Sequence, residues 1–199
     1  MEPGELVLVD AAANFQGLTG DITRTYPVSG RFSAAQREIY DVVLRAQGAG
    51  IAAARSGGRV TDVTKAVRAV IGAGLLDLGL VMDPRAATGD SAEIDMWYPH
   101  GPVHGIGMDV HDALGTLTPG AAFVIEPGLY IRPDTFERIA ATGETKALAA
   151  RIEPAVRRYW NMGVRIEDSF LMTDTGPLIL SAKAPRLPQD IEAIVGTGR

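Results

Sequence analysis

The sequence predicts one α+β domain, and three observations lead to that prediction. The chain has 199 residues, 46% of them hydrophobic, which is enough for one domain with its own core. Short β-type apolar runs and amphipathic helical patterns are intermixed along it, which is typical of the α+β class. Neither an internal repeat nor a low-complexity linker divides it. We therefore expect a single domain over residues 1–199.

The first predicted element is a β-hairpin. An apolar run from Leu6 to Val9 has the composition of a strand, and the turn signals Gly17 and Gly20 follow it. The β-branched run from Ile22 to Thr25 supplies the second strand. We expect this hairpin to end at Pro27 and Gly30.

Two amphipathic helices are predicted after the hairpin. Ser33 with Gln36 three residues later is a capping-box pattern, and the apolar residues that follow recur at near-helical spacing. We expect this helix to be ended by the pair Gly57–Gly58. The second helix is predicted to start near Thr61 and to stop at Gly79.

The second half of the chain alternates strand and helix signals. A charged, alanine-rich stretch over residues 134–159 predicts a helical excursion, which we interpret as part of a surface insertion over residues 132–162. A closing helix is predicted from about Pro188. The predicted short strands are Phe123–Glu126, Val164–Glu167, Phe170–Thr173 and Leu178–Leu180.

Composition narrows the function classes. The net charge of −5 comes from interspersed charges without a basic run, so we expect neither nucleic acid nor a membrane surface as partner. No apolar run reaches the roughly 18 residues that a membrane span requires, and no secretory signal precedes the first strand. The absence of cysteine excludes thiolate ligands and fits the reducing cytoplasm. We expect a soluble, cytoplasmic protein.

All three histidines, His100, His104 and His111, lie in the window "HGPVHGIGMDVH". The glycines and the proline between them disfavour a helix, so a loop or strand is expected there. Each histidine alone is more typical of a satisfied polar residue in a turn. Three imidazoles on one glycine-rich segment favour a functional site, because glycine is often found where the chain approaches a ligand closely.

Four acidic residues each adjoin an apolar β-type run: Asp10, Asp21, Glu126 and Glu167. Each alone could simply end a strand at the surface. Four carboxylates facing one interior would repel one another unless a divalent metal neutralised them. Two divalent ions balance four carboxylates, and oxygen donors with one imidazole favour Mn²⁺, with Co²⁺ or Zn²⁺ as alternatives.

At these residues the chain resembles a known family. The segments "LVDAAANFQGLTGDITRTYPVSGRF", "HGPVHGIGMDVHD", "VIEPGLYI" and "GVRIED" are similar, in this order, to the pita-bread (creatinase/aminopeptidase-like) metallopeptidases. The similarity is to the proline-specific branch, which contains Xaa-Pro aminopeptidases and Xaa-Pro dipeptidases (prolidases). It implies a pita-bread fold. Because that domain normally has several dozen residues before the strand at Leu6, we expect it to lack its N-terminal portion here, and to associate with another copy or with the missing part.

The resemblance also implies roles for individual residues. Asp21 and Glu167 match carboxylates that bridge the two metals, and Glu126 matches a ligand that also moves a proton. His100 and His111 match histidines that line the pocket and hydrogen-bond the substrate. Arg165 matches an arginine that hydrogen-bonds within the site. The implied metal ligands are Asp10, Asp21, His104, Glu126 and Glu167.

The activity that the resemblance implies is hydrolysis of the Xaa-Pro bond at the N-terminus of a peptide with proline at its second position. The segments "DITRTYPVSGRF" and "EPGLYI" favour the aminopeptidase, whereas the length of the insertion over residues 132–162 is similar to that of prolidases. An alternative of another class is a non-catalytic pita-bread module that holds a peptide or protein. The presence of all five implied ligands favours an enzyme.

Overall fold

The computed structural model describes residues 1–143 and 145–195. Its helices are α1 (Ala34–Ala53), α2 (Val60–Asp77), α3 (Pro133–Ala141), α4 (Lys146–Arg158) and α5 (Pro188–Val195), with short 3-10 helices η1 (Pro84–Thr88) and η2 (Ala92–Met96). Its strands are β1 (Leu6–Asp10), β2 (Asn14–Phe15), β3 (Leu18–Thr19), β4 (Thr23–Pro27), β5 (Ala122–Ile125), β6 (Gly128–Ile131), β7 (Met162–Arg165), β8 (Asp168–Thr173) and β9 (Gly176–Ile179). Intermixed strands and helices confirm the α+β class.

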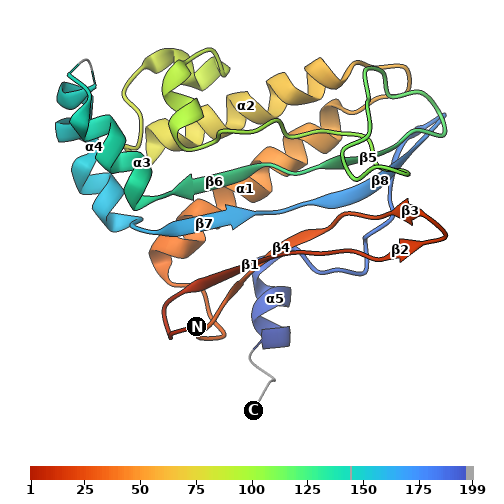
Figure 1. The fold of residues 1–199 in the computed structure, drawn as a ribbon, viewed down its shortest axis with the longest axis horizontal. Coiled ribbons are helices and arrows are strands. Elements are labelled where there is room, and N and C mark those ends of the chain that lie inside the picture. The colour runs from red at the N-terminus through yellow and green to blue at the C-terminus, as the bar shows by residue number, and fades with distance from the viewer. Residues whose placement is uncertain (144, 196–199) are drawn as a thin grey trace.

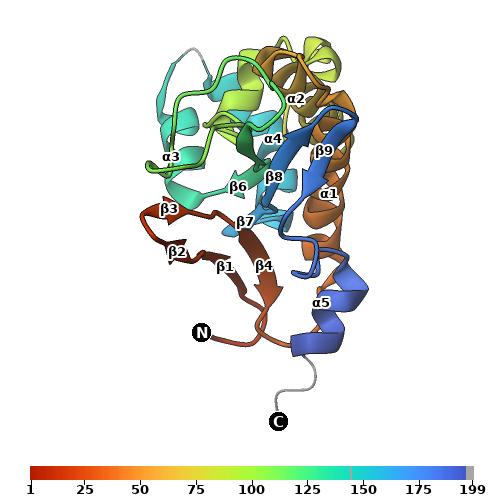
Figure 2. The ribbon, with the colours of Figure 1, turned by 90° about the vertical axis from the view of Figure 1, so that its right-hand side faces the viewer.

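The long helices α1 and α2 pack against each other and cover one side of the strands (Figures 1 and 2). The predicted capping box starts α1: the Ser33 hydroxyl accepts from the Gln36 N–H, and the Gln36 side chain accepts from the Ser33 N–H. A Cβ added at Gly50 would lie 2.9 Å from side-chain carbons of both Val67 and Ile125. Glycine therefore lets α1 approach α2 and the sheet at this point.

The strands form small antiparallel ladders whose ends meet. In the β1–β4 ladder Asp10 lies opposite Thr23, and in the β5–β8 ladder Ile125 lies opposite Asp168. β6 pairs with β7, which places Gly128 opposite Arg165. The backbone N–H of Glu167 donates to the carbonyl of Thr23 at 3.0 Å, which joins the end of the β7 strand to the start of β4. These joined ends position the candidate site.

Most predicted elements are present, with boundaries that differ. The predicted hairpin is β1–β4, and α5 begins at Pro188 as expected. The first helix ends at Ala53, before the glycine pair, because the chain turns there so that the Gly57 N–H bonds the carbonyl of Leu117. The β2–β3 hairpin, the strand β6 and both 3-10 helices were not predicted. Two-residue strands such as β2 and β3 are too short to show an alternating pattern.

The stretch predicted to be helical, residues 134–159, contains α3 and α4. They pack against each other between the end of β6 and the start of β7 (Figure 1). Ile139, Ile152 and Val156 are buried beneath them, so one face of this helical pair belongs to the core. The other face is charged and exposed.

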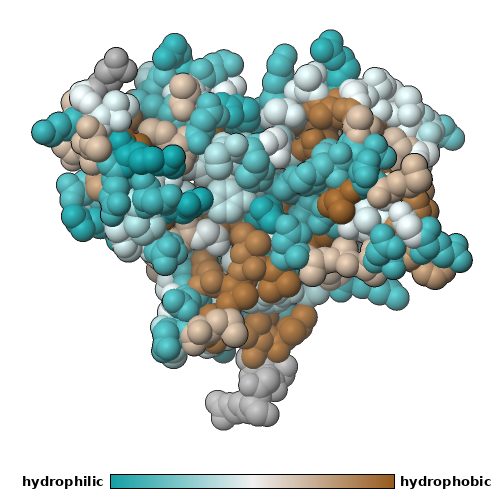
Figure 3. All heavy atoms as spheres, in the orientation of Figure 1, coloured by the Kyte–Doolittle hydropathy of each residue, from teal (hydrophilic) through white to brown (hydrophobic). Residues whose placement is uncertain are grey.

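Exposed apolar residues gather on one face of the molecule. Figure 3 shows apolar side chains over β1, in the lower centre of the view of Figure 1. Val9 is 43% exposed, and Phe15 and Leu18 of the β2–β3 hairpin are 73% and 57% exposed. Among the described residues, none of the helices is long and apolar enough to cross a membrane.

Candidate metal centre

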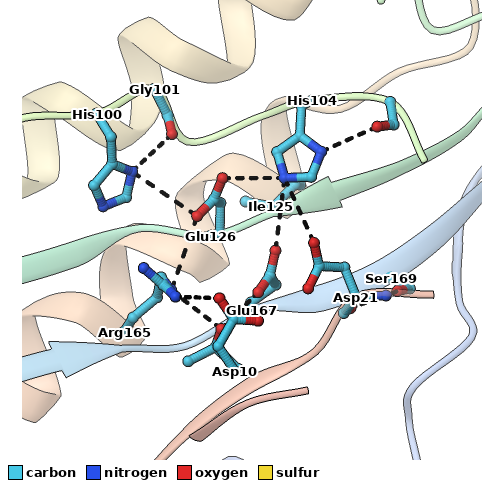
Figure 4. Close-up of polar contacts among 12 residues, drawn as sticks. Asp10, Asp21, His100, Gly101, His104, Ile125, Glu126, Arg165, Glu167 and Ser169 are labelled. Atoms are coloured by element: carbon cyan, nitrogen blue, oxygen red, sulfur yellow. Dashed lines mark hydrogen bonds and ion pairs between the residues drawn. The ribbon is translucent and has the colours of Figure 1, made fainter. Parts of the chain in front are cut away.

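The structure brings together the side chains of all five residues that the sequence singled out as metal ligands. They come from strand ends and from one loop, and they face one another (Figure 4). Asp10 is the last residue of β1, and Asp21 lies just before β4. Glu126 follows β5, and Glu167 connects β7 to β8. His104 lies in the loop that precedes β5.

Among the described residues, the potential ligand atoms form three overlapping groups, one of which comprises Asp21, His104 and His111. A second group comprises Asp10, Asp21 and Glu167, and a third comprises His104, Glu126 and Glu167; within each, one ligand atom per residue lies within 4.8 Å of the others. Glu167 belongs to the second and the third group. A carboxylate shared between adjacent oxygen-rich groups is the arrangement that holds two divalent cations side by side.

His104 provides the clearest test of whether these residues fit a metal. Its Nδ1 donates to the carbonyl of Gly105 at 3.0 Å, which leaves the lone pair of Nε2 free. Nε2 is buried and makes no hydrogen bond, although it lies 3.2 Å from Glu126 Oε1 and 3.9 Å from Glu167 Oε1. A lone pair facing carboxylate oxygens is repelled unless a proton or cation lies between them. The residues therefore fit a divalent metal.

Burial and mutual repulsion perturb the acids in the metal-free chain. Burial, reinforced by neighbouring carboxylates, raises the pKa of Glu167 to about 8 and that of Asp21 to about 6. Burial lowers the pKa of His104, but the Glu126 carboxylate and the Gly105 carbonyl outweigh it and raise that pKa above its ordinary value. In the metal-free chain Glu167 therefore keeps its proton at neutral pH.

Two hydroxyls with no signal in the sequence hold the buried acids Glu167 and Asp21 in place. The Thr23 hydroxyl donates to Glu167 Oε2 at 2.6 Å and accepts from Arg165 Nε at 3.1 Å. The Ser169 hydroxyl donates to the carbonyl of Asp21 at 2.6 Å. Thr23 is fully buried. Its place in a β-branched run gives no signal that distinguishes it from an ordinary strand residue.

The acid next to Glu167 points the other way. Asp168 is buried and pairs with Arg24 at 2.6 Å and with Arg186 at 3.1 Å. The Ser181 hydroxyl donates to the same carboxylate at 2.6 Å. Because successive strand residues face opposite sides, Glu167 reaches the candidate centre while Asp168 enters an arginine cluster behind it.

His100 and Arg165 lie on one flank of the centre and meet through Tyr130. The Tyr130 hydroxyl lies 2.8 Å from His100 Nε2 and accepts from Arg165 Nη1 at 3.2 Å. Arg165 also forms an ion pair with Asp10, and both His100 Nδ1 and Arg165 Nε lie 3.9 Å from Glu126 Oε2. The sequence analysis assigned no role to Tyr130, although "EPGLYI" contains it.

His111 lies beside Asp21 and His104 at the candidate centre. Its ring packs edge-on to that of His104 with centroids 4.3 Å apart, and it is exposed. The backbone of Gly105 exchanges two hydrogen bonds with that of Asp112, which folds the loop back on itself. A Cβ at Gly105 would lie 2.9 Å from the Asp112 carbonyl oxygen, so this fold requires glycine. All three histidines therefore lie at the centre.

Comparison with known proteins identifies the family. The model of metallopeptidase family M24 matches residues 1–174. The chain is 35% identical to an Xaa-Pro aminopeptidase of Escherichia coli and 37% identical to Xaa-Pro aminopeptidase 1 of Streptomyces coelicolor, over 100% and 95% of its length. It spans less than half of each of these relatives, 43% and 37%.

Solved structures confirm the predicted pita-bread fold. Zinc-substituted E. coli aminopeptidase P in complex with product superposes with a TM-score of 0.84 at 35% identity, over 100% of this chain and 43% of that one. Proline aminopeptidase P II of Yersinia pestis superposes with a TM-score of 0.80 at 35% identity, over 98% of this chain and 43% of that one. Together with the match of the family model, this similarity shows that the chain belongs to metallopeptidase family M24.

Proposed function

We propose that residues 1–199 form the catalytic domain of an Xaa-Pro aminopeptidase, which hydrolyses the Xaa-Pro bond at the N-terminus of peptides. The observation that carries the proposal is the buried, unbonded Nε2 of His104, which faces three carboxylates. The curated relatives named Xaa-Pro aminopeptidase support this activity over that of a dipeptidase.

Two divalent cations would be held by the five grouped side chains. Asp10 would contribute to holding one cation and His104 and Glu126 the other, and Asp21 and Glu167 would contribute to both. Mn²⁺ suits a donor set of carboxylates with one imidazole. When bound, a pair of such ions polarises a carbonyl and lowers the pKa of a water molecule.

The chain's own residues would bind substrate and move protons. Glu126 would carry the proton from the attacking water to the leaving amine, because its carboxylate faces the centre beside His104. His111 is exposed beside His104, where its ring can donate to the substrate carbonyl or the oxyanion. His100 would do the same by exchanging the hydrogen bond from its Nδ1 to the Gly101 carbonyl for one to the substrate, while Tyr130 stays at its Nε2. Arg165 would hold Asp10 in place through their ion pair. The nitrogen of an Xaa-Pro bond carries no hydrogen because it belongs to the proline ring. A pocket shaped for that ring would therefore select proline.

We further infer that the protein works in the cytoplasm, which the lack of cysteine supports.

A second inference is that another polypeptide surface covers β1. The apolar surface over β1, the strand that carries the exposed Val9, supports this inference, since such a patch marks an interface. Another copy of the chain, or a further part of the same protein, would cover it. Sedimentation tests this: a strictly monomeric species at all concentrations would contradict self-association.

The first experiment measures metal content and peptide cleavage together. The chain is loaded with Mn²⁺, desalted and analysed by plasma mass spectrometry, and then assayed on Ala-Pro-Ala and Ala-Ala-Ala. We expect about two ions per chain and cleavage of the proline peptide only. Asp21→Asn should lose both properties, whereas the exposed control Asp174→Asn should keep both. Retention of metal without cleavage would favour a binding module, and no retained metal would contradict the proposed centre.

A further inference from the structure

A cavity of about 610 Å³ lies beside the candidate metal centre, between helix α3 and the segment that ends at His100. Nothing in the proposed mechanism uses most of it. Its near end is formed by His100, Tyr130 and Arg165, which also contact the centre. Its far end is formed by Arg138 and Ile139 of α3 and by the residues that follow that helix. A peptide bound at the centre can therefore extend into this cavity.

The cavity combines apolar walls with hydrogen-bonding groups. Ile139 and Met96 contribute apolar surface, and Thr135 and Thr145 contribute hydroxyls. This mixture is typical of a site that binds a small organic group in a fixed orientation.

The charges along the cavity are not balanced. Asp95 is paired with Arg68 at 2.6 Å, and Arg132 is paired with Asp134 at 2.7 Å. Arg165 is paired with Asp10. Among the described residues, Arg138 is the guanidinium on this cavity that forms no ion pair with a carboxylate, although its charge helps to lower the pKa of Asp134. Its hydrogen bonds are long: Nε donates to the Asp134 carbonyl at 3.3 Å and Nη2 to the Thr135 hydroxyl at 3.4 Å.

We propose that Arg138 binds a carboxylate of the peptide substrate, which makes this cavity a specificity subsite. The inference rests on the proposed function, because it takes the substrate to be a peptide held at the metal centre. A guanidinium recognises a carboxylate through two parallel hydrogen bonds, and Arg138 has this fork available. The carboxylate can come from an acidic side chain before proline or from the C-terminus of a dipeptide.

The test compares matched peptides that differ by one charge. One pair is Glu-Pro-Ala amide and Gln-Pro-Ala amide, and the other is Ala-Pro and Ala-Pro amide. Dissociation constants are measured by calorimetry on the chain after treatment with chelator, so that binding is read without turnover. The variants are Arg138→Met, Arg138→Lys and the matched control Arg151→Met, which removes an exposed charge of α4 outside the cavity.

We expect the charged member of one pair to bind about threefold to tenfold tighter in the parent chain and in Arg151→Met. The pair that shows this preference identifies the source of the carboxylate. Arg138→Met should abolish the preference, and Arg138→Lys should keep part of it because the charge remains without the fork. The preference should weaken in 0.5 M NaCl.

Three outcomes would overturn the inference: no peptide binds, neither pair shows a preference, or the preference survives in Arg138→Met. Cleavage of Ala-Pro-Ala by the Mn²⁺-loaded chain is measured separately. Cleavage without a charge preference would refute the subsite and leave the proposed function intact. A preference without cleavage would refute the function and leave the carboxylate site intact.

Discussion

The two sides of the candidate centre differ in their exposure to water. On the inner side, Asp21 and Glu167 are 8% and 1% exposed, and hydroxyls of neighbouring strands hold them. On the outer side, Asp10 and His111 are exposed. Burial raises the pKa of both inner acids, so that a nearby cation favours their charged forms, whereas the outer groups can exchange water for a ligand. Binding of metal is therefore expected to depend on the inner side and access of substrate on the outer side.

The largest expected effect on metal content is the difference between replacing Glu167 and replacing Asp10. Glu167 belongs to two of the three groups of ligand atoms in the described part of the chain, whereas Asp10 belongs to one. After Mn²⁺ loading we expect Glu167→Gln to retain no metal and Asp10→Asn to retain about one ion of the two. Plasma mass spectrometry of the desalted variants measures this. Equal loss in both variants would show that the two sides do not differ in this respect.

The pH dependence of stability should come from the inner side. The folded chain keeps protons on Glu167 and Asp21 up to pH values near 8 and 6, whereas the unfolded chain loses them near pH 4. Across that window the folded state binds more protons, so the free energy of unfolding of the metal-free chain should fall as pH rises and level off above about 8.

Urea unfolding in the presence of chelator at pH 5, 6.5 and 8 checks this dependence. Glu167→Gln should flatten the curve, because an amide has no proton to lose, and Asp10→Asn should leave most of the slope. A metal-free parent chain that gains stability between pH 5 and 8 would contradict the raised pKa values.

An intermediate effect is expected for the hydroxyl that orients Glu167. Thr23→Val should weaken Mn²⁺ binding about tenfold, because the bridging carboxylate loses its hydrogen-bond donor. Thr25→Val is the control, because Thr25 lies two residues after Thr23 on the same strand. The Thr25 hydroxyl hydrogen-bonds the backbone of Arg165 and not a carboxylate. This variant should cost about 1 kcal/mol of stability without changing the affinity. If both variants bind metal equally well, Thr23 is only structural.

The smallest effect on metal binding is expected on the outer side. His111→Gln should change Mn²⁺ affinity less than about twofold, because we assign its ring to the substrate. A nitrogen of His111 nevertheless lies within 4.8 Å of ligand atoms of Asp21 and His104. Calorimetric titration with Mn²⁺ decides between the two roles. A loss of one bound ion would make His111 a ligand.

The sequence indicated the acids and histidines that the structure groups together, but not the residues that hydrogen-bond to them. Asp10, Asp21, Glu126 and Glu167 stand out because acids beside apolar strands are uncommon. Thr23 and Tyr130 could not be found in this way. Their roles depend on which strand ends meet, as when Thr23 reaches Glu167 across 144 positions of sequence. Local patterns carry no information on such pairings.

The boundary errors have a similar cause. The end of α1 depends on a hydrogen bond from Gly57 to Leu117, and β6 becomes a strand because β7 pairs with it. Arg138 could not be identified as a candidate from sequence. It stands out only because the neighbouring arginines form ion pairs with carboxylates and Arg138 does not. Patterns within one segment predicted elements, and contacts between segments decided their ends and their functions.

The neighbours Glu167 and Asp168 show one electrostatic problem solved in two ways. Both are buried acids on the same turn of chain, and each needs positive charge. Asp168 obtains it from Arg24 and Arg186, which are part of the polypeptide and cannot leave. In the proposed centre Glu167 obtains it from ions that exchange with the surroundings. A chelator can therefore remove the positive charge beside Glu167 while Asp168 stays paired with its arginines. Local order in this segment is therefore expected to depend on the supply of metal.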